Sequence, residues 1–288
     1  MLLDKGRGVG GRMATRRAGE SRFDHGAQFF TVRDDRFRLA VARWESGNLV
    51  APWFTEGGHV RYRAVGGMNN LAKHLAGPLD VRTAAKVVRV EAKGGWSAVT
   101  EAGETFRAGA LLLTAPAPQS AALLEECPDA APSPILCALR SIEFDSCFAL
   151  LAILDGPSRV SKPGYVRPGE GPVEWIADDT QKGVSAGAPA LTIHGRADFS
   201  RRHLEAPRDL VSRLLLEAAE PAFGANVASW QLHLWRYSRP VDAERPACLF
   251  ATEPALLAVA GDAFGGSRID TAFLSGLAAA KRILAAAG

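Results

Sequence analysis

The residues Leu2-Leu3-Asp4-Lys5-Gly6-Arg7-Gly8-Val9-Gly10-Gly11-Arg12 are the most informative part of the chain. In them, two apolar residues lead to an acid, a glycine turn and arginine. In dinucleotide-binding folds this order is typical of the second strand of the βαβ unit, whose terminal carboxylate hydrogen-bonds the adenosine ribose. We therefore expect Asp4 at a ribose and Arg12 at a pyrophosphate. We also expect the first strand and its phosphate loop to be missing from this chain.

A second interpretation uses the same glycines, because Gly6, Gly8 and Gly11 satisfy the pattern G-x-G-x-x-G of a phosphate loop. That pattern requires a buried strand before it and an apolar helix after it. Only Met1–Leu3 precede it, and residues 12–20 are too polar for a helix packed on a sheet. The second-strand interpretation is favoured, and a phosphate loop or a flexible Gly/Arg-rich leader remain the alternatives.

Composition places the chain among globular proteins. It has 288 residues, of which 47% are apolar and 23% are charged. A chain of this length and composition can form two hydrophobic cores. The net charge of +3 is local, because arginines crowd residues 7–22. Such a cluster favours a small phosphorylated ligand over nucleic acid, which needs a basic face over much of a domain.

Targeting signals and metal motifs are not recognisable in the sequence. The start lacks a secretory apolar core, and no run reaches the roughly 18 apolar residues of a membrane helix, so we expect a cytoplasmic protein without a membrane partner. The four cysteines are widely spaced and form no C-x-x-C or Cys/His pair, which predicts reduced thiols and no metal site.

The pattern of elements predicts an α/β protein in which an antiparallel α+β substrate domain is inserted into a Rossmann-like FAD-binding domain lacking its first strand and helix. We expect the FAD-binding domain at 1–126 and 250–288, and the substrate domain at 127–249. In the middle part a single amphipathic helix, 208–219, interrupts the strands expected at 135–144, 147–154, 173–176, 191–194 and 229–235. The run Ala110–Pro116 indicates a strand buried on both faces.

The end of the chain returns to nucleotide-type elements. A short apolar strand at 256–260 leads through the glycine-rich loop 261–267 into a long Ala/Leu-rich helix at 269–287. Backbone amides and a helix N-terminus then face a ligand. A flavin dinucleotide is long enough to need both the first and the last segment of the chain.

Several segments together resemble the renalase-type flavoproteins, which are FAD-dependent oxidoreductases related to the amine oxidases. They are Asp4-Lys5, residues 8–16, Phe23–Phe30, Gly66–Asn69, Ala260–Asp262 and Ser275–Leu277, in the family's order over nearly the whole chain. Two departures are that the usual ribose-binding Glu is Asp4, and that the family's N-terminal phosphate-binding segment is absent.

The resemblance implies roles for individual residues. Asp4 would hold the ribose, Arg12 the pyrophosphate, Asp262 the ribityl or phosphate end, and the amides at 266–269 the pyrimidine edge of the ring. The cofactor-binding residues would be Asp4, Lys5, Gly10, Gly11, Arg12, Gln28, Phe29, Gly67, Met68, Val88, Gly261, Asp262, Gly266 and Ile269. Substrate contacts are expected from Phe30, Trp175, His194 and Tyr237, and more loosely from Asp178, Asp179, Gln181, Lys182 and Arg196.

The sequence shows no triad or paired acidic motif, so we assign no catalytic residue. A dihydropyridine gives hydride directly to flavin N5, and the protein then needs only to align the two rings. No cysteine lies in 261–276, which disfavours covalent attachment of the flavin through that segment.

Three functions are compatible with the resemblance. The first is oxidation of NAD(P)H isomers reduced at the wrong nicotinamide carbon, with oxygen as electron acceptor, as in renalase-type enzymes. The second is FAD-dependent oxidation of a small amine, and the third is a non-enzymatic remnant. We expect this chain to bind FAD weakly and to be less stable than one extended upstream by about 30 residues, the length of a βα unit.

Overall fold

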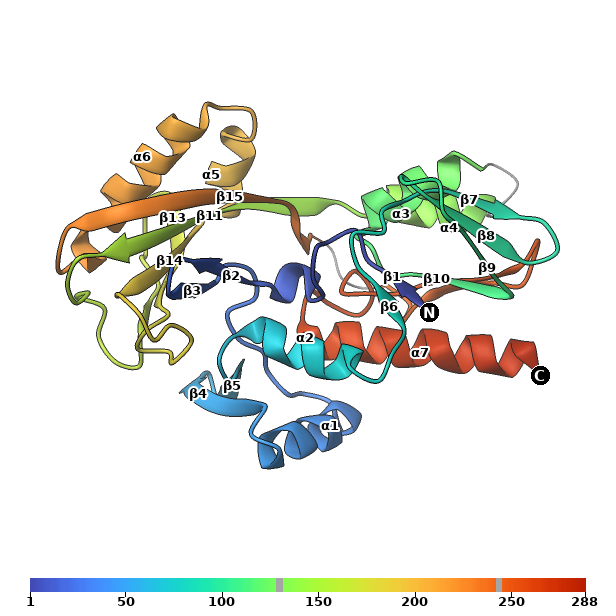
Figure 1. Ribbon diagram of the computed structural model, residues 1–288, viewed down its shortest axis with the longest axis horizontal. Helices are drawn as coiled ribbons and strands as arrows, with labels where there is room; N and C mark the ends of the chain where they lie inside the picture. Colours follow the sequence, from blue (N-terminus) through green and yellow to red (C-terminus); the bar gives the residue numbers. More distant parts are fainter. Residues whose placement is uncertain (128–131, 242–244) are drawn as a thin grey trace.

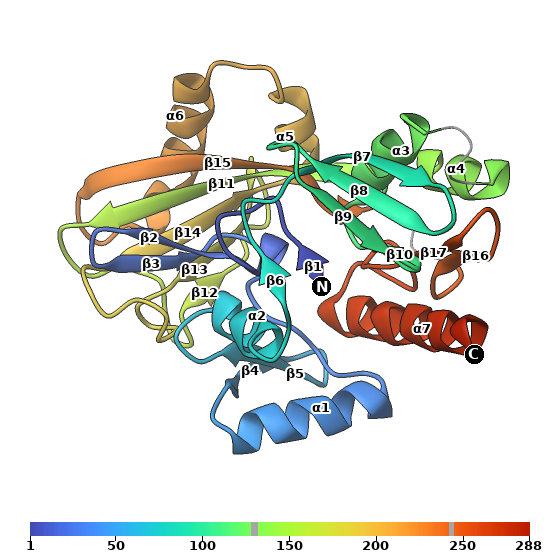
Figure 2. The same cartoon turned by 45° about the vertical axis from the view of Figure 1, so that its right-hand side comes forward.

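The structure is a computed structural model, which describes residues 1–127, 132–241 and 245–288. Its elements form two lobes, joined below by a third, smaller group (Figure 1). One lobe is built on a five-stranded sheet, the other on the strands and helices near the chain's end. Figure 2, turned by 45°, shows α7 (Ile269–Ala287) lying along the second lobe, apart from the five-stranded sheet.

The five-stranded sheet confirms the antiparallel sheet predicted for the middle of the chain. Its order is β12-β13-β14-β11-β15, and all four pairings are antiparallel. The strands are β11 (Phe144–Leu154), β12 (Tyr165–Val166), β13 (Val173–Asp178), β14 (Ala190–Gly195) and β15 (Val227–Pro240). Alternate residues such as Phe148 and Leu150 pack on α6 (Arg208–Ala219), while α5 (Ala197–Arg202) lies on the same face. The hairpin of β2 (Thr15–Ala18) and β3 (Ser21–Asp24) covers the opposite face, where Phe23 packs on Leu151.

The second lobe holds the nucleotide-type elements. β10 (Ala110–Leu113) and β17 (Leu256–Val259) are parallel, and β16 (Leu249–Ala251) adds an antiparallel strand. Leu257 and Val259 face α3 (Ala117–Glu125) and α4 (Ser133–Arg140), whereas Ala258 faces α7. A meander of β7 (Val87–Ala92), β8 (Trp96–Thr100) and β9 (Thr105–Ala108) completes the lobe, and β1 (Leu2–Leu3) pairs in parallel with β6 (Val81–Arg82).

The third group connects the lobes. It consists of α1 (Asp35–Ser46), β4 (Val50–Glu56), β5 (His59–Ala64) and α2 (Met68–Ala76), packed around Phe37 and Met68. The segment from the first glycines enters this region as a 3₁₀ turn, η1 (Gly11–Met13), and no α-helix follows it before α1. The glycines therefore lack the helix that a phosphate loop requires. A second 3₁₀ turn, η3 (Glu220–Ala222), follows α6.

Two local predictions are wrong. Most of the segment 135–144 is not a strand, because Ile135 and Leu139 face one core from successive turns of α4. This helix begins at Ser133 and has Pro134 in its first turn. The run 110–116 is not buried on both faces, since Leu112 is 40% exposed. β10 lies at the edge of its sheet. The helix α7 covers the neighbouring strands β17 and β16 rather than β10.

The domain limits at 127 and 250 stay a prediction. The packing of α4 against α3 favours a boundary closer to Phe144, because Leu139 joins the core of the second lobe. Among the described residues, no helix is both long and apolar enough to cross a lipid bilayer.

Candidate active site

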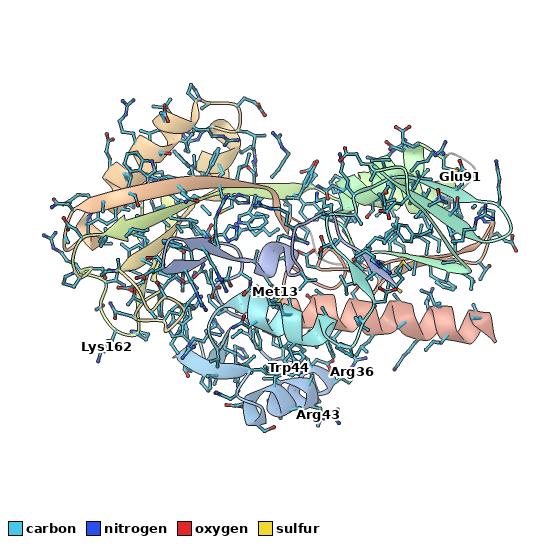
Figure 3. The ribbon with its side chains drawn as sticks, viewed as in Figure 1. Met13, Arg36, Arg43, Trp44, Glu91 and Lys162 are labelled. Atoms are coloured by element: carbon cyan, nitrogen blue, oxygen red, sulfur yellow. The ribbon has the colours of Figure 1, made fainter. Side chains whose placement is uncertain are left out.

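A cleft of about 650 Å³ opens where the three parts of the molecule meet. Figure 3 labels Met13, one of its lining residues, at the centre of the molecule. The lining comes from η1, the loop 26–33, the five-stranded sheet and the start of α7. A smaller hollow of about 450 Å³ is lined only by residues of β7–β9 and their turns, so the larger cleft, on which distant segments converge, is the candidate site.

The two ends of the chain meet at this cleft through Arg12 and Asp262. Arg12 Nη1 lies 2.5 Å from Asp262 Oδ2, and Nη2 lies 2.7 Å from Oδ1, although the residues are 250 positions apart. Such a bidentate pair fixes the planar guanidinium in one orientation. The glycine segment and the terminal loop are thereby held together at one edge of the cleft.

The loop after β3 is held from both sides. The amide of Ala27 donates to Arg12 O at 2.8 Å. The carbonyl of His25 accepts from Trp235 Nε1 at 2.7 Å and lies 3.1 Å from His194 Nε2. Gly26 has no room for a side chain, because a Cβ there would lie 2.0 Å from Arg12 O. The loop is thus fixed between η1 and the five-stranded sheet, with Gly26 and Ala27 lining the cleft.

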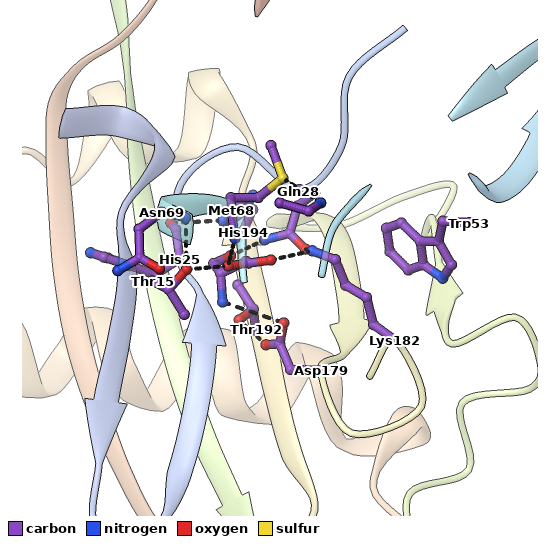
Figure 4. Close-up of polar contacts among 12 residues, drawn as sticks. Thr15, His25, Gln28, Trp53, Met68, Asn69, Asp179, Lys182, Thr192 and His194 are labelled. Atoms are coloured by element: carbon purple, nitrogen blue, oxygen red, sulfur yellow. Dashed lines mark hydrogen bonds and ion pairs between the residues drawn. The ribbon is translucent and has the colours of Figure 1, made fainter. Parts of the chain in front are cut away.

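A buried polar network lies behind the loop (Figure 4). The carboxylate of Asp24 accepts from Thr15 Oγ1 at 2.6 Å, Met68 N at 2.8 Å and Lys182 Nζ at 2.9 Å. Lys182 Nζ also donates to Gln28 Oε1 at 3.3 Å, and Gln28 Nε2 donates to Asp24 O. Both ends of the Gln28 amide are therefore fixed at the cleft wall.

Burial keeps two titratable groups of the cleft, His194 and Cys147, uncharged. It lowers the pKa of His194 to about 4 and raises the pKa of the Cys147 thiol to about 12. Behind the wall, burial also lowers the pKa of His25 to about 4. At neutral pH the two imidazoles and the thiol carry no charge.

The last helix places its N-terminus at the cleft. Ser267, Arg268 and Ile269 line it, and the helix dipole makes this end positive. Arg268 Nε donates to Asp270 Oδ1 at 2.9 Å, while Arg268 N donates to Thr271 Oγ1 at 3.2 Å. The predicted order of strand, glycine loop and helix is present here. It places a helix N-terminus, which favours anions, at the cleft.

An aromatic wall, formed by Phe29, Phe54, Tyr165 and Trp175, reaches the cleft through Phe29 and Trp175. The rings of Tyr165 and Trp175 stack with centroids 4.7 Å apart and an angle of 7° between their planes. Arg167 lies 4.6 Å from the centre of the Trp175 ring, and Arg61 lies 5.4 Å from that of Phe29. Guanidinium groups therefore already cover parts of this wall.

About half of the residues expected to bind ligand line the cleft. They are Arg12, Gln28, Phe29, Gly261, Asp262 and Ile269 from the cofactor set, and Phe30, Trp175 and His194 from the substrate set. Their roles remain predictions.

The other expected residues lie elsewhere. Asp4 follows β1, where its carboxylate accepts from Gly6 N, and Lys5 donates to Gln119. Met68 is a core residue, Val88 is 40% exposed on β7, and Tyr237 packs edge-on against Phe144. Gly10, Gly11, Gly67 and Gly266 are also outside the lining, and each has a positive φ.

The looser candidates of the middle part have structural partners instead. Asp178 accepts from Ser158 Oγ and two loop amides, and Gln181 donates to Asp178 and to Val160 O. Asp179 accepts from Thr192 Oγ1, Lys182 pairs with Asp24, and Arg196 binds three loop carbonyls. None of these five side chains lines the cleft.

Sequence reasoning missed the charged residues that the fold brings to the cleft. These are Arg33, Arg61, Asp145, Arg167, Glu174, Arg239 and Arg268. Single charges inside strands and loops have no spacing that distinguishes them from exposed ones. Only the pairing of the strands shows which side chains reach the cleft.

Comparisons with known proteins match this chain to flavoenzymes. The family model described as flavin containing amine oxidoreductase matches residues 44–284, and that of an NAD(P)-binding Rossmann-like domain matches residues 1–43. The fold is similar to "Putative protoporphyrinogen oxidase" from Exiguobacterium sp. 255-15, with 17% identity and a TM-score of 0.61 over 80% of this chain and 53% of that one. It is also similar to cyclohexylamine oxidase from Brevibacterium oxydans IH-35A, with 13% identity and a TM-score of 0.60 over 80% of this chain and 55% of that one. A triple mutant of putrescine oxidase matches with 15% identity and a TM-score of 0.60 over 78% of this chain and 54% of that one. The chain spans about half the length of these solved structures.

Proposed function

Because this chain belongs to the family of flavin-containing amine oxidoreductases, we propose that it is an FAD-dependent oxidoreductase whose electron donor is a dihydronicotinamide nucleotide. The finer assignment, oxidation of misreduced NAD(P)H isomers with oxygen as acceptor, follows the resemblance to renalase-type enzymes. The single observation that carries the choice of donor is the charge of the cleft.

Six arginines line the cleft against three acids. The arginines are Arg12, Arg33, Arg61, Arg167, Arg239 and Arg268, and the acids are Asp145, Glu174 and Asp262. Glu56 and Asp270 pair with three of these arginines from outside the lining, which leaves an excess of one positive charge. An alkylammonium substrate is repelled by this excess, whereas a nucleotide is attracted by it. The aromatic wall is also less suited to an amine, because Arg61 and Arg167 already lie over Phe29 and Trp175.

The residues at the cleft fit an elongated anionic cofactor. Arg12 would bind the pyrophosphate, and Gly261, Ser267 and Ile269 would approach the flavin end, where the helix dipole stabilises negative charge. When bound, FAD supplies the electron sink for hydride transfer.

The chain's own residues then position the donor and exclude water. Phe29 and Trp175 offer planar surfaces to a nicotinamide ring. His194, with its pKa lowered to about 4, is too weak a base to deprotonate an alkylammonium. A dihydronicotinamide needs no such proton removal, so the uncharged His194 favours it over an amine.

Anaerobic mixing of the flavin-loaded protein with candidate donors tests this function. We expect the 2- and 6-dihydro isomers of NAD(P) to bleach the oxidised-flavin absorbance, and primary amines to leave it unchanged. Bleaching by amines alone would support the amine-oxidase alternative. Weak FAD binding together with no bleaching by either class would support the non-enzymatic alternative.

A further inference from the structure

Two arginines on the aromatic wall share one carboxylate. Arg61 Nη2 and Arg167 Nη2 each lie 3.2 Å from the same atom, Glu56 Oε2. The two nitrogens are therefore no farther apart than twice that distance. Because one carboxylate faces two guanidinium groups, Glu56 leaves one positive charge of the cluster unbalanced.

The arginine pair, Arg61 and Arg167, packs against aromatic rings. The Arg61 side chain is only 13% exposed and lies over Phe29, while Arg167 lies over Trp175. Both arginines line the cleft. A guanidinium stacked on a ring keeps its N–H edges available, and their planar fork matches the oxygens of a phosphate.

Two buried donors on this wall have no acceptor among the described residues. They are Arg61 Nε and Trp175 Nε1. Buried N–H groups are nearly always hydrogen-bonded in folded proteins, because leaving one without an acceptor is costly. Both residues line the cleft, so a ligand rich in acceptor oxygens would offer partners for donors that the described residues leave without one.

We infer that Arg61 and Arg167 form a subsite for the phosphate of the nucleotide substrate, with Glu56 orienting the pair. The inference rests on the proposed function, since it assigns the part of the dihydronicotinamide nucleotide that the aromatic wall recognises. The subsite sets specificity and takes no part in hydride transfer. It selects nucleotides over nicotinamide derivatives that lack a phosphate.

Titration calorimetry in the presence of saturating FAD tests the subsite. The probes are nicotinamide mononucleotide, nicotinamide riboside and inorganic pyrophosphate, with FAD blocking its own phosphate site. We expect the mononucleotide to bind about tenfold more tightly than the riboside, and Arg61→Gln or Arg167→Gln to remove about that factor. Riboside binding stays unchanged, and mononucleotide affinity falls with added salt.

Arg202→Gln is the matched control, because Arg202 is an exposed arginine on α5 that pairs with Asp198 outside the cleft. It should not change the binding of any probe. If Arg61→Gln does not fold, Arg167→Gln carries the test, since its side chain is 43% exposed. In anaerobic flavin reduction, both cleft variants should raise the donor concentration at half-saturation more than they lower the limiting rate.

The outcomes separate this inference from the proposed function. Equal binding of mononucleotide and riboside by the unmodified protein would overturn the subsite, even where both dihydro forms reduce the flavin. Pyrophosphate binding that the Arg61→Gln/Arg167→Gln double variant abolishes would support the subsite even if no dihydronicotinamide reduced the flavin, in which case only the proposed function fails. Unchanged mononucleotide binding by the double variant would overturn the subsite.

Discussion

Lys182 and Asp24 form an ion pair in which both side chains are fully buried, with Nζ 2.9 Å from Oδ2. Lys182 comes from the loop between β13 and β14, and Asp24 ends β3, so the pair joins the five-stranded sheet to the segment that leads into the cleft. Lys182 Nζ also lies 4.8 Å from the centre of the Trp53 ring. Through Gln28, the pair fixes part of the cleft wall.

Replacing Lys182 should strongly destabilise the protein. Lys182→Met leaves the Asp24 carboxylate buried without its cation, which typically costs about 3–5 kcal/mol. Chemical denaturation measures the free energy of unfolding. The control is Lys73→Met, at an exposed position on α2. The Asp24→Asn/Lys182→Met double variant should recover part of the loss, and a single variant as stable as the unmodified protein would contradict this role.

Asp179→Asn should stabilise the protein increasingly as pH rises. Burial raises the pKa of Asp179 to about 7, although Lys182 opposes the shift. A raised carboxyl pKa favours folding below the ordinary value near 4, and this contribution is lost as pH rises toward 7. Asparagine does not titrate, so its advantage grows across that window and levels off above it. Denaturation curves at pH 5 and pH 8 measure the difference in the free energy of unfolding between the variant and the unmodified protein. The same difference at both pH values would refute the prediction.

Gly26→Ala should distort the loop at the cleft. The new Cβ would lie 2.0 Å from Arg12 O and 3.4 Å from Trp235, and a backbone atom cannot rotate away. We expect a loss of stability of at least about 1–3 kcal/mol, the range for overpacked sites, together with weaker FAD binding. Gly8→Ala is the matched control, since its Cβ meets nothing within 4 Å. Equal thermal unfolding midpoints for the two variants would argue against a tight loop.

Asp262→Asn should weaken FAD binding about tenfold, as expected for loss of a hydrogen-bonded charge. The substitution removes the charge that holds the Arg12 guanidinium in its bidentate geometry. Quenching of FAD fluorescence on binding measures the affinity. Asp209→Asn, at an exposed position on α6, provides the control. Unchanged FAD affinity in Asp262→Asn would show that the pair does not organise the site.

Elements with a strong local signal were predictable. The helices at 208–219 and 269–287 have the predicted limits, because their apolar spacing and their flanking residues agree. The segment 135–144 was not predictable by alternation, since short apolar runs fit a helix or a strand equally well. Its helical form depends on the core that Leu139 enters beside α3.

The candidate site also has a part that the sequence predicted and a part that it did not. Its glycine-rich and terminal segments are continuous in sequence, so their meeting at Arg12 and Asp262 agrees with the expectation that both ends converge on one ligand. Lys182 was expected at the substrate, and it lies instead in a buried pair behind the wall. The partner of this lysine is a carboxylate 158 positions away in the sequence. The residues next to Lys182 therefore do not show whether it faces a ligand or a carboxylate.

Neighbouring residues are enough to predict the α/β class, the antiparallel middle sheet and the strand–glycine loop–helix at the end, because backbone preferences and apolar periodicity act over short stretches of chain. Which charges face the cleft depends instead on how distant segments pack. Arg61, Arg167 and Glu56 come together because β4 and β5 pair and lie against β12 and β13, and electrostatic interactions depend on distance in space rather than along the chain.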